Sequence, residues 1–173
     1  CQMIERSPKL YKTGDTVSHA THGIGTIKAI EEKEILGSTA VFATLYFENS
    51  EMKLTVLKKD LEEQVREILS EEEALEILNY LGSHDETLAQ NWKTRNRKNK
   101  ERLTSGDPRE LCTVAKGLLM LKQKKNGMLS TADRNQLQKA LNLLAEELAR
   151  ALDEDPQNME DKLREVCMDS MAA

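Results

Sequence analysis

Hydrophobic and polar residues follow two different periods along this chain of 173 residues. In its first third, short runs of β-branched and aromatic residues alternate with turn-forming glycine, asparagine and serine, a pattern typical of antiparallel strands. These runs predict a small curled sheet or barrel of four or five strands, whose open edges are places where partner proteins can add a strand. The predicted strands cover residues 16–18, 24–30, 40–47 and 52–57.

Beyond residue 57 the strand pattern stops and helical spacing begins. Ser70 is followed three residues later by Glu73, which predicts a capping box in which each side chain satisfies a backbone amide of the other residue. Asp107 before a proline, and Ser130 further on, predict two more helix starts. Apolar residues at helical spacing predict the buried faces: Ala74, Leu75, Leu78 and Leu81; Leu111, Val114, Ala115, Leu118, Leu119 and Leu121; Leu137, Ala140, Leu141, Leu144, Ala145 and Leu148.

Two further helices complete the predicted organisation. One begins near Leu88, carries a basic run and ends at Ser105, and the other begins at Asp155 as a short, loosely packed acidic tail. The fold class is therefore α+β, with a small antiparallel β module followed by an all-α helical bundle. The predicted boundaries are a β module over 10–60, a linker over 61–69, a helical domain over 70–152 and the acidic tail over 153–173.

The composition excludes several classes of protein. No apolar run approaches the roughly 18 residues that a bilayer requires, so no membrane association is expected. Cys1, Cys112 and Cys167 are too far apart for a disulfide framework or a CxxC metal site. With 32% charged and only 3% aromatic residues, long solvated helices are favoured over an all-β sandwich. A reduced, cytoplasmic and monomeric protein is the expectation.

Positive charge is concentrated beside the only tryptophan. The chain has a net charge of -5, yet six cations and one acid lie within residues 91–103. A solvated helix face is the simpler interpretation of such a run, and a core position is usual for a single tryptophan. The acidic background and the polar neighbours of the tryptophan favour a polyanion site instead. In that site Trp92 stacks on or wedges between bases, while phosphates are held by Lys93, Arg95, Arg97 and Lys98.

Catalytic and metal-binding patterns are weak. His19 and His22 have an i, i+3 spacing that could supply two metal ligands, but no Cys, Asp or Glu cluster nearby completes a site. A turn rich in histidine and glycine is therefore favoured over a metal-dependent enzyme built on this pair. Gly23 and Gly25 lack the third glycine and the following helix of a dinucleotide fingerprint. The sequence predicts a protein that is not an enzyme and needs no cofactor and no metal.

Several motifs resemble one family of bacterial proteins. The stretch Tyr11-Lys-Thr-Gly-Asp-Thr-Val17, followed by His22-Gly-Ile-Gly25, resembles the opening of the CarD/CdnL transcription regulators. It also resembles the polymerase-interacting module of the transcription-repair coupling factor. The helical half of CarD-type proteins, which that module lacks, is similar to Asn91-Trp-Lys-Thr-Arg95, Leu103-Thr-Ser-Gly-Asp107, Leu129-Ser130 and Leu143-Leu-Ala-Glu-Glu-Leu148. The resemblance covers roughly residues 10 to 150.

The resemblance implies a transcription regulator associated with the nucleoid. Its Tudor-like N-terminal domain would bind the β subunit of RNA polymerase, and its helical domain would contact promoter DNA at the upstream edge of the melted region. The residue that matches Trp92 is the minor-groove wedge that slows collapse of the open complex. The polymerase contact matches the end of the last strand, with a further basic residue facing an acidic lobe of the polymerase; the matching positions are Val56, Leu57, Lys59 and Lys33.

Two stretches depart from the family pattern. Ser18-His19-Ala20 stands where a Tyr-Pro pair is usual, and Lys58-Lys59 stands where Val-Pro or Ile-Pro is usual. The lysine pair removes a rigid edge and adds charge, so the details of the polymerase contact are expected to differ. The principal alternative is an adaptor, associated with polymerase or repair, whose helical half meets protein instead of DNA. It predicts negligible affinity for DNA even at low salt.

Overall fold

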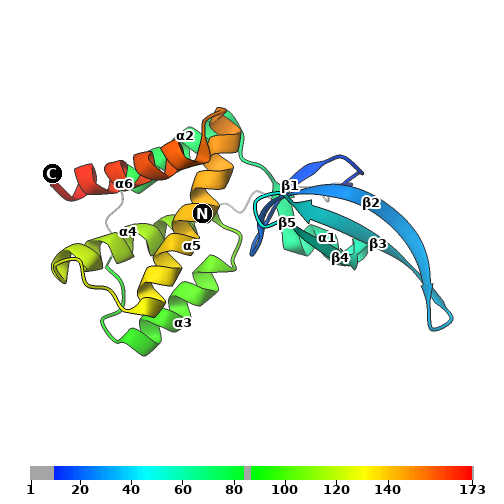
Figure 1. The fold of residues 1–173 in the computed structure, drawn as a ribbon, viewed down its shortest axis with the longest axis horizontal. Coiled ribbons are helices and arrows are strands. Elements are labelled where there is room, and N and C mark those ends of the chain that lie inside the picture. The colour runs from blue at the N-terminus through cyan, green and yellow to red at the C-terminus, as the bar shows by residue number, and fades with distance from the viewer. Residues whose placement is uncertain (1–9, 84–86, 173) are drawn as a thin grey trace. The chain divides into compact units, whose positions relative to one another are not determined.

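The computed structural model describes residues 10–83 and 87–172, so Cys1 lies outside the described residues. The chain divides into two compact units between Glu67 and Ile68. The first unit is an antiparallel sheet and the second is a set of packed helices, which confirms the α+β class (Figure 1).

The N-terminal unit is one antiparallel sheet whose strand order is β4-β3-β2-β1-β5. Its small core includes Val17, Leu45 and Phe47, all of which are buried. Gly25 packs against the ring of Phe47, where an added Cβ would lie 2.6 Å from the nearest ring carbon, so only glycine fits there. The elements are β1 (Thr16–His19), β2 (Gly23–Ile35), β3 (Ser38–Phe47), β4 (Met52–Leu57), α1 (Lys58–Gln64) and β5 (Val65–Glu67).

The predicted linker over 61–69 is wrong for most of its length. Leu61 of α1 is buried in the core of the sheet, and Val65 of β5 pairs with His19 of β1. Residues 58–67 are mostly charged or polar, and they contribute little more than these two apolar side chains. A helix and a strand this short carry no recognisable period, so only the packing reveals them.

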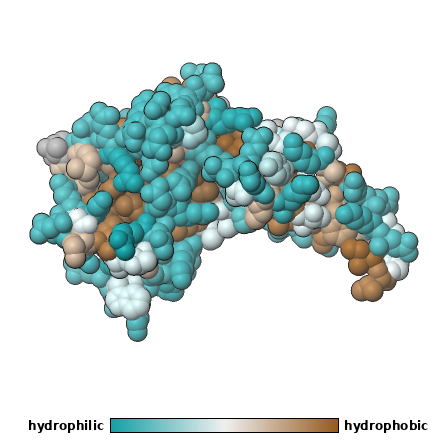
Figure 2. Space-filling model, viewed as in Figure 1, coloured by the Kyte–Doolittle hydropathy of each residue, from teal (hydrophilic) through white to brown (hydrophobic). Residues whose placement is uncertain are grey.

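The β2–β3 hairpin continues well beyond the core of the sheet as a two-stranded arm (Figure 1). The strand predicted to end at residue 30 in fact extends to Ile35. The prediction stopped short because both faces of the arm are solvated, so its sequence does not alternate between apolar and polar residues. At its tip, Ile35 is 51% exposed and Leu36 is fully exposed. Hydrophobic residues accordingly gather at the end of the arm in Figure 2.

The described residues of the second unit form five helices, whose apolar faces share one core. The faces predicted from the spacing are buried, except that Leu75 is 52% exposed and Leu121 is only partly buried. The predicted capping box is present, since Ser70 N donates to Glu73 Oε1 and Glu73 N donates to Ser70 Oγ, both at 3.1 Å. The helices are α2 (Glu71–Ser83), α3 (Trp92–Leu103), α4 (Pro108–Lys124), α5 (Thr131–Leu152) and α6 (Pro156–Ala172).

Helix α6 corrects the expectation of a short, loosely packed tail. It has 17 residues, and Met159, Leu163 and Cys167 are completely buried against the other helices. These positions are four residues apart, so they form one narrow stripe, while most of the other residues of the helix are charged or polar. The acidic composition hid an element that closes the core.

Buried polar groups tie the helices of this unit together. Lys116 of α4 is 1% exposed, and its Nζ donates to the backbone oxygen of Leu81 at 2.8 Å and to Ser170 Oγ at 2.9 Å.

Burial raises the pKa of Cys112 to about 12 and that of Cys167 to about 11, so both thiols stay protonated and unreactive at neutral pH. Among the described helices, none has the length and apolarity needed to cross a membrane.

Candidate nucleic-acid interface

Helix α3 begins at the tryptophan itself, four residues later than predicted. Asn91 is the N-cap, and its Oδ1 accepts from Lys93 N at 3.0 Å and from Thr94 N at 3.2 Å. Trp92 is therefore the first residue of the helix, and it is 62% exposed. Lys93 Nζ lies 5.9 Å from the centre of the indole ring, within the range of a cation–π contact. The exposure expected of Trp92 is confirmed.

The cations of α3 fall into an exposed set and a paired set. Lys93, Arg97, Lys98 and Lys100 are exposed. Three of them, at 93, 97 and 100, are spaced by four and three residues and share one side of the helix. Arg97 Nη1 lies 3.2 Å from Glu101 Oε1, but both side chains are more than 60% exposed, so this ion pair is weak. Arg102 is held by Glu110 of α4 at 3.5 Å.

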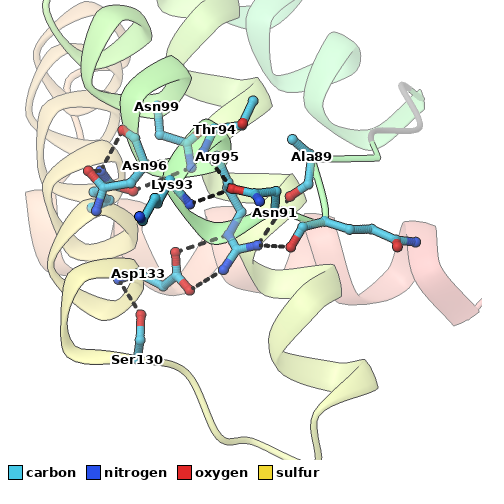
Figure 3. A network of polar contacts seen from close by, with 11 residues as sticks. Ala89, Asn91, Lys93, Thr94, Arg95, Asn96, Asn99, Ser130 and Asp133 are labelled. Atoms are coloured by element: carbon cyan, nitrogen blue, oxygen red, sulfur yellow. Dashed lines mark hydrogen bonds and ion pairs between the residues drawn. The ribbon is translucent and has the colours of Figure 1, made fainter.

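The prediction that Arg95 binds a phosphate is wrong. Its side chain is 5% exposed, and its guanidinium faces Asp133 of α5, with Nε 3.2 Å from Oδ1 and Nη2 3.0 Å from Oδ2. Arg95 Nη1 also donates to the carbonyl oxygens of Ala89 and Gln90, both at 3.1 Å (Figure 3). A guanidinium enclosed by these acceptors cannot reach a phosphate. Helical spacing alone does not show which cations are enclosed.

A second polar contact fixes α3 against α5. Asn99 Nδ2 donates to Gln136 Oε1 at 3.4 Å, and Gln136 Nε2 donates to the carbonyl oxygen of Asn96 at 3.2 Å. Neither Asp133 nor Gln136 was predicted as part of this site, because Asp133 lies in the first turn of the helix that begins after Ser130, where an acidic residue is common. Its backbone N does donate to Ser130 Oγ at 3.1 Å, but its carboxylate binds Arg95. Both residues lie on the apolar stripe of α5, a signal that could have revealed them.

The predicted polymerase-binding residues lie on the sheet unit. Lys33 pairs with Ala40, and Leu57 pairs with Phe42 two residues further along β3, so Lys33 and Leu57 share one face. That face is opposite to the core. Lys33 is roughly half exposed beside Glu31, at 3.9 Å.

The remaining two predicted polymerase contacts differ from each other. Val56 packs against the core, so it offers its edge backbone rather than its side chain. Lys59 is exposed on α1 instead of extending the last strand. β4 nevertheless forms one end of the described sheet, with Lys53 and Thr55 exposed along it.

The histidine pair is occupied by local contacts. His19 Nδ1 accepts from Thr21 N at 3.1 Å and from His22 N at 3.3 Å, and the two imidazoles lie 4.8 Å apart. Burial lowers the pKa of His19, the charge of His22 lowers it further, and a hydrogen bond with Gln64 opposes both. Within the described residues, no three His, Cys, Asp or Glu side chains come together as a metal site. The geometry is that of a histidine-rich turn.

Comparison with known proteins covers both units. The family described as "CarD, C-terminal domain" matches residues 76–164, and the family described as "CarD-like/TRCF RID domain" matches residues 11–69. The chain is 28% identical over 143 residues to the "Putative transcription factor YdeB" of Bacillus subtilis (strain 168). That alignment covers 80% of this chain and 90% of the Bacillus protein. The two matched domains agree with the two units of the structure.

Proposed function

Because this chain belongs to the CarD family, we propose that it is a transcription regulator that binds the β subunit of RNA polymerase and stabilises promoter open complexes. In this proposal the Tudor-like N-terminal unit holds the polymerase. The helical unit contacts DNA at the upstream edge of the melted region, without strong sequence readout. The protein performs no chemistry, since its effect comes from binding alone.

The exposed tryptophan at the start of α3 carries the proposal for DNA. A large aromatic side chain that is 62% exposed, next to exposed cations, is unusual in a protein with a net charge of -5. Aromatic rings stack on bases or wedge between base steps, and lysines and arginines beside them neutralise phosphates. Trp92 is the wedge in this proposal, with Lys93, Arg97 and Lys100, which share one side of α3, as the phosphate contacts. Lys98, which was also predicted to bind a phosphate, is exposed on a different side of the helix and is not counted among these contacts.

The open edge of the sheet supports the proposal for polymerase. Among the described strands β4 pairs with β3 alone, so its outer backbone groups are available to a partner strand. Leu57 and Lys33, on the face away from the core, would add side-chain contacts beside that edge. Val56 contributes edge backbone, and Lys59 contributes charge from α1.

The division of labour between the units is tested with Trp92→Ala. Polymerase binding should be retained in a pull-down with core enzyme, whereas the stabilisation of open complexes should be largely lost. Met128→Ala is the matched control, because Met128 is another large exposed side chain of the same unit, at 75% exposure. It should preserve both properties.

Three other outcomes contradict parts of the proposal. Equal loss of polymerase binding and open-complex lifetime in Trp92→Ala would refute the separation of the two units. Polymerase binding without any effect of the wild-type protein on lifetime would favour an adaptor that meets protein instead of DNA. No polymerase binding at all would show that the Lys58-Lys59 departure directs this chain to another partner.

A further inference from the structure

The segment that leads into Trp92 is held by hydrogen bonds to a buried arginine. Residues 87–91 have no helix or strand of their own. Arg95 Nη1 donates to the carbonyl oxygens of Ala89 and Gln90, while Nε and Nη2 donate to the carboxylate of Asp133 (Figure 3). One guanidinium thus joins the segment before α3, the first turn of α3 and the first turn of α5.

Apolar packing supports this segment at Leu88, which packs against the helical core. Leu88 packs over Gly117 of α4, where an added Cβ would collide with its side chain. Next to that contact lies a cavity of about 270 Å³, bounded by residues 87–90, Arg95 and the C-terminal half of α4. Close packing therefore anchors the segment at Leu88, but residues 89 and 90 border open space. The hydrogen bonds from Arg95 hold the backbone at these two residues, which lie between that anchor and Trp92.

The energetics of the buried pair point the same way. Burying a guanidinium and a carboxylate has a large desolvation cost, and an apolar pair of similar volume often gives equal or greater stability. An apolar pair at positions 95 and 133 could fill the same space. It could not donate hydrogen bonds to two carbonyl oxygens of the preceding segment, a task for which the fork of an arginine is well suited.

We propose that Arg95 is a positioning residue, which orients Trp92 by fixing the segment before it. Gln90, whose carbonyl it holds, is two residues before Trp92, and Asn91 caps the same turn. The indole therefore projects from a helix start that is fixed on both sides. This assignment rests on the proposed function, in that an oriented Trp92 is useful only if it meets DNA. Preorganisation of this kind lowers the ordering cost of binding.

The test uses the full chain with Arg95→Met and Asp133→Leu together. Because Trp92 is the only tryptophan, its time-resolved fluorescence anisotropy reports the motion of this one side chain, without DNA or polymerase. The expected result is an unchanged or higher melting temperature, with at least a twofold larger amplitude of nanosecond depolarisation. A purely structural role would change the melting temperature and leave the indole motion of the folded protein unchanged.

DNA binding gives a second, independent readout. The double variant should bind DNA roughly fivefold more weakly, a loss typical of a disturbed stacking contact. The dependence of its affinity on salt should stay the same, because no phosphate contact is removed. A salt slope reduced by about 0.9 would instead show that Arg95 holds a phosphate. That outcome would overturn the assignment.

Two further variants keep the test decisive. The control Arg102→Met with Glu110→Met removes another ion pair of α3, away from residues 89 and 90, and should leave the indole motion unchanged. If the apolar pair does not fold, Arg95→Lys serves, because an ammonium keeps the charge beside Asp133 but cannot hold the carboxylate and both carbonyls together. Its indole motion should rise as well. Wild-type motion in a folded variant would overturn the proposal.

The proposed function can fail separately from this inference. If Trp92→Ala leaves open complexes unaffected, the role of Trp92 in DNA binding is refuted. The anisotropy of the double variant would still decide whether Arg95 fixes the tryptophan.

Discussion

Three exposed cations on one side of α3 set the expected strength of the proposed DNA contact. Lys93, Arg97 and Lys100 are exposed and share that side, whereas Arg95 is enclosed and Arg102 is paired. If each of the three neutralises one phosphate, the logarithm of the binding constant should fall with the logarithm of salt concentration with a slope of about -2.7. Affinity should then drop about 40-fold between roughly 50 and 200 mM salt.

Lys93→Gln tests this count. Removing one of three phosphate contacts should reduce the slope to about -1.8, so that affinity drops only about 12-fold over the same range of salt. Lys162→Gln is the matched control, because Lys162 carries the same charge on α6 and pairs with Glu154 at 3.7 Å. It should leave the slope unchanged.

Glu101→Gln, which releases Arg97 from its weak ion pair, should raise the affinity for DNA about two- to fivefold at low salt.

The assay is the fluorescence anisotropy of a labelled, forked DNA duplex, titrated with the full chain at a series of salt concentrations. If Lys93→Gln keeps the wild-type slope, α3 does not face the phosphates and the count of three contacts is refuted. If Lys162→Gln reduces the slope equally, the attraction is a diffuse property of the whole surface, and the assignment to α3 is refuted as well. Affinity that is negligible even at the lowest salt would favour the adaptor.

Two further predictions concern stability. Leu163→Ala should lower the free energy of unfolding by about 2–5 kcal/mol, because it opens a cavity beneath α6. Leu75→Ala, at an exposed site, should change this free energy by about 0.5 kcal/mol or less. Equal losses for the two variants in urea denaturation would contradict the packing of α6. Burial, together with the charge of His22, lowers the pKa of His19 below its ordinary value of 6.5. As the pH falls, the unfolded chain therefore takes up a proton at this histidine before the folded chain does. The stability that neutral His19 contributes is complete above pH 6.5 and is lost as the pH falls below that value. His19→Gln should flatten the pH dependence of unfolding of the N-terminal unit, and an identical loss below pH 6.5 in that variant would assign the effect to other groups.

The sequence was most informative where one local signal decided the outcome. Ser70 and Glu73 form their predicted capping box, and Asp107 caps α4 as expected, with Oδ1 accepting from Arg109 N at 2.9 Å. The apolar stripe of α5 is buried throughout. It was predictable because an amphipathic helix between solvent and core carries its apolar residues at helical spacing. Trp92 was expected at the surface because its neighbours are polar. Local chemistry determines each of these features.

Features that depend on distant parts of the chain were not predictable in the same way. Arg95 is enclosed only because Asp133, 38 residues later, lies opposite it. The helical period placed Arg95 correctly on α3 but could not show what covers it. Likewise, α6 is buried through single residues four apart, a stripe too narrow to distinguish from an acidic tail. The arm formed by β2 and β3 has no buried face, so its sequence shows no alternation of apolar and polar residues from which it could be predicted.

The enclosure of Arg95 also strengthens the reason for tethering. With three phosphate contacts in place of the larger set that the basic run suggested, DNA binding by the free protein should be weak and close to sequence-neutral. A protein held on polymerase experiences the adjacent DNA at an effective concentration on the order of 1 mM. A dissociation constant between about 10 and 100 μM, ordinary for non-specific contacts, then gives occupancy of roughly 90% or more. Weak binding by the free protein keeps it off bulk DNA, so under the proposed function the few cations on α3 restrict the tryptophan to promoters already held by polymerase.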